Sequence, residues 1–150
     1  MRYGTYVLFI HFDDPKEMTV GALGTIRFHG DLCYIGSAMN GLDQRISRHL
    51  SKDKKIHWHI DHITVAADSI EAFESPSYDE CGLRRKAEEA GMIPAVKGFG
   101  CSDCRCDTHL LRSDEKSRIR LIESERLTGS LTADRSERAN TQTVPLSKDL

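Results

Sequence analysis

The chain has 150 residues, 39% of them hydrophobic, and a formal net charge of −2, which suits one soluble domain and argues against a protein that coats duplex nucleic acid. A local basic cleft remains compatible with this charge. No stretch approaches the roughly 20 apolar residues of a membrane span, and the N-terminal segment lacks a signal-peptide cleavage pattern, so we expect no membrane partner and a cytoplasmic location.

The segments before residue 113 alternate between strand and helix patterns. Strands are expected over residues 6–12, 25–28, 32–37, 58–67 and 108–112. Helices are expected over residues 40–50 and 75–91, and between the first strands we expect a loop over 13–24 and a hairpin turn over 29–31. This order predicts an α+β domain with a small, mainly antiparallel sheet flanked by helices.

The composition changes near residue 113, after which no aromatic residue occurs. Such a polar segment buries little apolar surface on folding. Ile119, Ile122 and Leu127 still give a thin apolar stripe, which predicts one helix within residues 114–127. We therefore expect a domain over residues 1–113, followed by a charged helix and by disorder beyond Gly129.

Two tyrosines occur in strand-like runs, in Gly4-Thr5-Tyr6 and Tyr34-Ile35-Gly36. If these strands pair, both phenols face one site, near the start of the helix that Glu80 begins. The helix over 40–50 would add Arg45, Arg48 and His49. A phenol or an imidazole transfers protons, a guanidinium stabilises a phosphorane, and a carboxylate holds a divalent metal. Taken singly, each residue also has an ordinary structural role.

In order and spacing these motifs resemble the GIY-YIG nuclease superfamily: a G-x-Y strand, a Y-I-G strand, a helix with L-x-x-R and a helix with a metal-binding Glu. Residues 1 to about 112 are also similar to a prokaryotic GIY-YIG-like family of unknown function, whose members occur alone or fused to endonuclease III-type DNA glycosylases. The stretches that carry this similarity are "GTYVL", "YIGSA", "RISRHL", "HWHID", "DEC" and "GFGCSDCRCDTHLL".

The resemblance implies a metal-dependent endonuclease that acts on nucleic acid, DNA rather than RNA, in DNA repair and alongside repair proteins. It implies catalytic roles for Tyr6, Tyr34, Arg45, His49 and Glu80, with Mg²⁺ or Mn²⁺ bound by Glu80. The residues expected to line the substrate site are Gly36, Ser37, Arg48, His59, Asp61, Ser102, Asp103, Cys104 and His109. The alternative is a non-catalytic module on the same scaffold that binds nucleic acid or a partner protein.

Histidines and cysteines admit a second kind of site. "HWHIDH" read as a strand places His57, His59 and Asp61 on one face, either lining the pocket or forming an edge with Trp58 and Ile60 in the core. Cys101, Cys104, Cys106 and His109 supply enough soft ligands for zinc. Structural zinc sites usually join two separate ligand pairs, and this cluster is compact, so we expect no zinc there. A zinc-stabilised interaction domain remains the third hypothesis.

Overall fold

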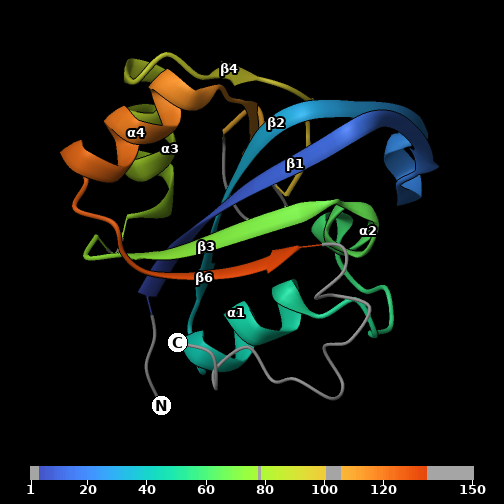
Figure 1. The fold of residues 1–150 in the computed structure, drawn as a ribbon, viewed down its shortest axis with the longest axis horizontal. Coiled ribbons are helices and arrows are strands. Elements are labelled where there is room, and N and C mark those ends of the chain that lie inside the picture. Colours follow the sequence, from blue (N-terminus) through green and yellow to red (C-terminus); the bar gives the residue numbers. More distant parts are fainter. Residues whose placement is uncertain (1–3, 78, 101–105, 135–150) are drawn as a thin grey trace.

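The computed structural model describes residues 4–77, 79–100 and 106–134, and within them one antiparallel sheet is flanked by helices (Figure 1). The strands are β1 (Gly4–Thr19), β2 (Thr25–Ala38), β3 (Ser69–Ser75), β4 (Ile93–Pro94), β5 (Leu110–Arg112) and β6 (Thr128–Asp134). The helices are α1 (Leu42–Leu50), α2 (His59–Ala66), α3 (Glu80–Glu89) and α4 (Glu115–Ser124), with a 3-10 turn at Gly21–Leu23. The strand order is β4-β5-β2-β1-β3-β6, and the predicted α+β class is confirmed.

The centre of the sheet is a long hairpin of β1 and β2, paired from Gly4–Ala38 to Thr19–Thr25. The predicted turn over 29–31 is wrong because β2 continues through it, and the predicted loop over 13–24 is correct only for residues 20–24 because β1 continues to Thr19. The register shifts between Phe12 and Lys16, and Gly30 lies opposite Phe12 with φ +68°. A glycine with positive φ is typical of a β-bulge, so the turn-like sequence marks an irregularity within the hairpin.

Alternation along β1 gives the sheet two buried faces. Tyr6, Leu8 and Ile10 point to one face and pack with apolar residues of α1 and α2. Val7 and Phe9 point to the opposite face and pack with apolar residues of α3 and α4. The four helices therefore cover the sheet from both sides, two on each face (Figure 1).

The segment over residues 58–67 is a helix, α2, and not the predicted strand. A short apolar run fits either structure on periodicity alone. Here the carboxylate of Asp61 accepts the backbone N–H groups of His57 and Trp58 at 2.8 and 2.9 Å, which begins the helix. The sheet strand is the following segment, β3, which the sequence analysis did not predict.

The helix predicted within residues 114–127 is present as α4, which Asp114 caps by accepting the backbone N–H of Ser117. The boundary expected at residue 113 does not separate two units, because Leu121 packs in the core and β6 pairs with β3. Disorder directly beyond Gly129 is likewise wrong, since β6 continues to Asp134. Residues 135–150 lie outside the described residues. In the described chain, none of the helices has the length and hydrophobicity that a membrane span requires.

Candidate functional site

The two tyrosines lie on the same face of the β1–β2 hairpin. Tyr6 pairs with Gly36 and Leu8 pairs with Tyr34, so the phenols come from diagonal positions. Their ring centroids are 6.5 Å apart, and both rings belong to the core cluster beneath α1 and α2. The prediction that the two phenols share one face is confirmed.

Gly36 is required by the tyrosine opposite it. A Cβ atom at position 36 would lie 2.5 Å from the Tyr6 hydroxyl oxygen and 2.6 Å from its Cζ atom. The space that we expected a substrate to use is filled by the Tyr6 phenol. Gly100, with φ +71°, plays a similar part at Tyr34, where a Cβ would lie 3.1 Å from the ring.

His49 completes the buried aromatic cluster. The Tyr6 hydroxyl lies 2.7 Å from His49 Nε2, and the Arg45 guanidinium also hydrogen-bonds to Tyr6. Since the guanidinium only donates, the Tyr6 O–H donates to Nε2, which assigns the proton of the neutral imidazole to Nδ1. Among the described residues, Nδ1 has no hydrogen-bond partner.

Burial decides the protonation states of this pair. Desolvation, with the nearby charge of Lys54, lowers the pKa of His49 to about 3, so the imidazole is neutral near pH 7. Burial also raises the pKa of Tyr6 well above its usual range, although Arg45 acts in the opposite direction. Tyr6 therefore stays protonated and orients His49, and it is not suited to deprotonate water.

Arg45 and Arg48 lie against the exposed indole of Trp58. Their guanidinium carbons are 4.5 and 5.0 Å from its ring centroid, and Trp58 is 37% exposed to solvent. Arg45 also donates to the carbonyl oxygen of Ser37 at 3.1 Å. This surface of two guanidinium groups and an indole matches the chemistry of a phosphate and a nucleobase.

Asp61 is a buried residue that supports Arg48, and it does not line the site. Its side chain is fully buried and accepts from Arg48 Nη2 at 2.7 Å. Burial raises the pKa of Asp61, but hydrogen bonds from Trp58, His57 and Arg48 outweigh that effect and lower it overall. The buried Lys54, which the sequence analysis missed, donates to Thr64 Oγ1 at 2.6 Å and to the Arg48 carbonyl at 2.9 Å. No sequence pattern marks Lys54 for this role.

Glu80 is the first residue of α3 and meets the hairpin at its open end. Its Oε2 atom lies 2.6 Å from His109 Nδ1, and Ser37 also hydrogen-bonds to it. Burial raises the pKa of Glu80, but the hydrogen bonds from His109 and Ser37 and the nearby charge of Arg45 lower it overall. Glu80 is therefore ionised. Its negative charge raises the pKa of Tyr6, whereas the positive charge of Arg45 lowers it.

His109 is buried and hydrogen-bonds to Glu80, and its side chain is not exposed to a substrate. Burial lowers its pKa, but the hydrogen bond and charge of Glu80 raise it to about 10. The His59 ring packs 5.5 Å from Phe99, and its Nδ1 accepts the Gly100 N–H at 3.4 Å. The predicted substrate residues Ser102, Asp103 and Cys104 lie outside the described residues.

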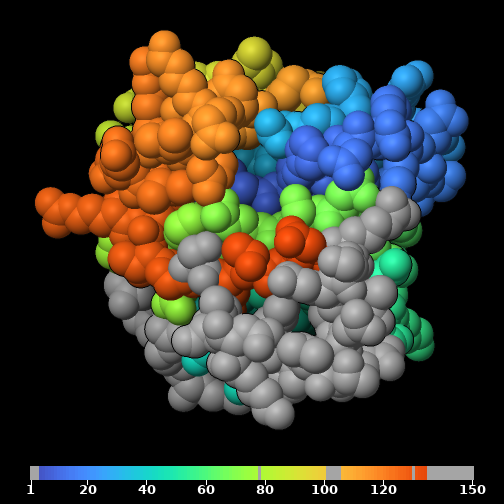
Figure 2. Space-filling view, viewed as in Figure 1, coloured from blue at the N-terminus to red at the C-terminus, as the bar shows by residue number. Residues whose placement is uncertain are grey.

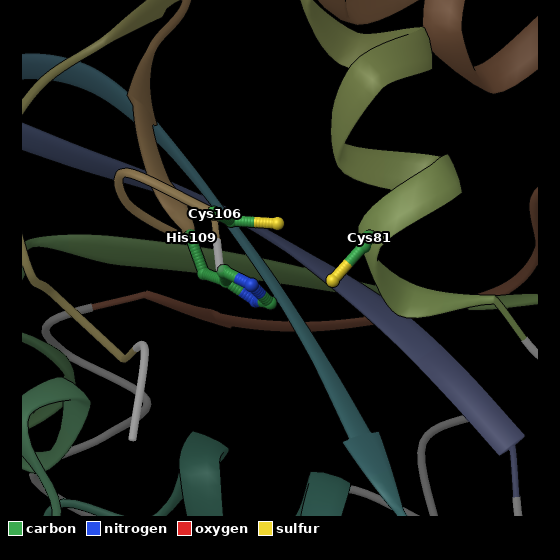
Figure 3. A group of neighbouring side chains, drawn as sticks. All are labelled: Cys81, Cys106 and His109. Carbon is green, nitrogen blue, oxygen red and sulfur yellow. The ribbon is translucent and has the colours of Figure 1, made fainter. Parts of the chain in front are cut away.

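Two thiols lie close to His109. Cys81, Cys106 and His109 each offer a ligand atom, and these atoms are all within 4.8 Å of one another (Figure 3). Cys81 directly follows Glu80 in α3, a position that the sequence analysis passed over. These are the side chains in the described part of the protein that form a group suited to a soft metal.

A separate hollow lies between α4 and the hairpin, over β3 and β6 (Figure 2). It has a volume of about 230 Å³. Two pairs of its polar side chains are in contact, Arg118 with Glu71 and His11 with Asp31. This hollow contains none of the residues of the tyrosine site, which we define as Tyr6, Tyr34, Arg45, His49 and Glu80.

Comparison with known proteins gives one finding. A family model described as "Domain of unknown function DUF123" matches residues 5–129, from the first strand to the start of β6. No curated protein and no solved structure matches the chain. The match covers far more than half of the sequence, including every described residue of the tyrosine site, and the chain therefore belongs to the DUF123 family.

Proposed function

We propose that this protein is a metal-dependent endonuclease that hydrolyses phosphodiester bonds in nucleic acid, DNA rather than RNA. One observation carries the proposal: Tyr6, Tyr34 and His49 form one aromatic cluster on the hairpin, Arg45 of α1 is bound to the Ser37 carbonyl beside it, and Glu80 of α3 is held at the same end by His109. A cation for the phosphate and a carboxylate for a metal are thus set around one Tyr–Tyr–His cluster. The resemblance to GIY-YIG nucleases in the order of these residues supports the same conclusion.

Arg45 is the group that would meet the scissile phosphate. It is half-buried and already bound to the Ser37 carbonyl, which limits its conformations. Its stacking on Trp58 holds the guanidinium plane and leaves an aromatic surface beside it for an unstacked base. A positioned guanidinium lowers the energy of a pentacoordinate phosphorane more than that of the substrate phosphate.

Glu80 suits Mg²⁺ or Mn²⁺ because it is an ionised carboxylate whose side chain is partly exposed. These cations accept one or two carboxylates and complete their coordination with water and substrate oxygens. The metal would supply Lewis-acid stabilisation of the phosphate. The chain's own contribution is to hold the carboxylate with His109 and to place it near Arg45.

Tyr34 is the remaining proton carrier. Tyr6 holds the His49 ring through the hydrogen bond to Nε2. The Nδ1 atom, which carries the proton, therefore points away from the Tyr6 hydroxyl. Tyr34 keeps 9% of its surface exposed, against 2% for Tyr6, which makes it the more accessible phenol. In this proposal Tyr34 orients the attacking water, while the Tyr6–His49 pair is a positioning unit.

One observation favours the alternative of a non-catalytic nucleic-acid-binding module. Tyr6 and His49 are almost completely buried, whereas Trp58 is exposed and the two arginines beside it are partly exposed. A surface that only binds would need the exposed groups alone. The two functions therefore differ in whether the buried cluster matters for more than stability.

The test is incubation of the full chain with labelled branched, damaged, duplex and single-stranded DNA and with RNA. Each substrate is tested with Mg²⁺, with Mn²⁺ and with EDTA. The nuclease proposal expects cleavage of at least one DNA that requires the metal. Binding without cleavage, weakened by Trp58→Ala, would instead establish the binding module.

A further inference from the structure

Two thiols and one imidazole meet where α3 begins. Cys81 lies in the first turn of α3, whereas Cys106 and His109 come from the segment that leads into β5. Their ligand atoms lie within 4.8 Å of one another, and the sulfur atoms of Cys81 and Cys106 point toward each other beside the imidazole (Figure 3). Both thiols are partly exposed and neither is in a disulfide. The group thus joins two separate segments and supplies three of the four ligands that a tetrahedral structural zinc site uses.

The orientation of His109 is the second, independent observation. Its Nδ1 lies 2.6 Å from Glu80 Oε2 and 3.1 Å from the Ile35 carbonyl oxygen. A histidine that binds a metal through Nε2 usually donates its Nδ1–H to a carboxylate or a carbonyl oxygen, which fixes its tautomer. Both kinds of acceptor are in place at Nδ1, so Nε2 is the atom that would bind a metal, and the Cys106 thiol already hydrogen-bonds to this imidazole.

The donor set selects the ion. Thiolates are soft ligands, and two of them with an imidazole favour Zn²⁺ over Mg²⁺ or Ca²⁺, which prefer oxygen. The expectation that the cysteines bind no zinc was based on the compactness of Cys101, Cys104 and Cys106. Cys81 changes that argument, because it supplies a ligand from a different element.

We propose that Cys81, Cys106 and His109 bind one zinc ion, which fastens the start of α3 to the segment before β5. The ion replaces two thiol protons and the Nε2 proton, and no electron transfer is involved. Because Cys81 follows Glu80 and His109 contacts Glu80, the ion also holds this carboxylate in place. This site does not depend on the nuclease proposal, since its ligands are distinct from Glu80 and its readout is metal content.

The experiment measures metal in the full chain, purified under reducing conditions without chelator or a histidine tag. Mass spectrometry of the elements should give close to one zinc per wild-type chain. Replacement of zinc by Co²⁺ should add the intense near-ultraviolet band of thiolate-to-cobalt charge transfer, and an excess of Mg²⁺ should not displace it.

Two variants and a matched control assign the ligands. Cys81→Ser and Cys106→Ser should each reduce bound zinc to a small fraction of the wild-type content and weaken the cobalt band. Cys33→Ala removes a cysteine that is buried in the core and should leave both readouts unchanged, with circular dichroism confirming that every variant is folded. Wild-type protein that holds no zinc and binds no Co²⁺ through thiolates would overturn the proposal. So would a Cys81–Cys106 disulfide in protein kept reduced, or full zinc content in both serine variants.

Discussion

The fit between Gly36 and Tyr6 gives a sharp prediction for Gly36→Ala. The new methyl group would overlap the Tyr6 hydroxyl at 2.5 Å, and the phenol has no room to retreat because it is almost completely buried. Overpacking of this kind costs roughly 1–3 kcal/mol, and a displaced hydroxyl leaves His49 Nε2 without its donor, which costs about 1–3 kcal/mol more. We expect a total loss on the order of 2–6 kcal/mol, seen as a fall in melting temperature of roughly 10 °C.

Thermal and urea denaturation of four variants measures this effect: Gly36→Ala, Gly30→Ala, Tyr6→Leu, and Tyr6→Leu combined with Gly36→Ala. Gly30→Ala is the matched control, because a Cβ there has nothing within 4 Å and only the positive φ, +68°, opposes it. In a Tyr6→Leu background the clashing phenol is absent, so Gly36→Ala should become much less destabilising. A Gly36→Ala protein as stable as wild type, or a cost that is equal in both backgrounds, would refute the argument.

Three further predictions concern stability. Burial holds the pKa of His49 at about 3 against an ordinary 6.5, so between these values only the unfolded chain binds the proton, and stability falls as pH falls. Lowering the pH from about 7.5 to about 5 should therefore reduce the free energy of unfolding by about 2 kcal/mol through this group. Denaturation of His49→Gln should not show this loss, and an equal pH dependence of the two proteins would contradict the prediction. Asp61→Asn should cost on the order of 3 kcal/mol because it breaks a buried ion pair, whereas the exposed Asp53→Asn should change stability little, and similar melting temperatures would oppose it. A chain ending at Gly129 should be less stable than one ending at Asp134 by about 2 kcal/mol or more, since it lacks most of β6 with the buried Ala133, and equal stability would show that β6 is dispensable.

Local signals were sufficient for part of the fold. The spacing of Leu42, Ile46 and Leu50 predicted α1, and all three residues are buried. The helices α3 and α4 were also expected, and their caps, Asp79 and Asp114, are side chains of the usual type. These elements are determined by residues a few positions apart, which a sequence shows directly.

The missed elements depend on contacts between distant segments. α2 begins at a carboxylate, Asp61, that is held by Arg48 of α1, and no local pattern reveals this pairing. β6 is short and polar, and it is a strand because β3 offers it an edge. A polar composition after residue 113 therefore did not predict where the packed chain ends.

The candidate site divides in the same way. Motif order indicated Tyr6, Tyr34, Arg45, His49 and Glu80, and the structure brings them together at one end of the hairpin. The motif order did not indicate which residues only support the site. Asp61 and His109 hold other site residues in position, and Gly36 leaves space for Tyr6. The stacking of Trp58 and the position of Cys81 arise only from the tertiary arrangement.

The most direct test of the central claim is the single-turnover cleavage rate of wild type and Arg45→Ala on a DNA substrate with Mg²⁺ or Mn²⁺. Arg120→Ala is the control, because this arginine is exposed on α4, on the opposite face of the sheet. We predict metal-dependent cleavage by the wild type and by Arg120→Ala, and a loss of roughly 10²–10³-fold in Arg45→Ala, with a much smaller loss of DNA binding by fluorescence anisotropy. Cleavage by Arg45→Ala at the wild-type rate, or no cleavage of any substrate by the wild type, would contradict the claim that these residues form a nuclease active site.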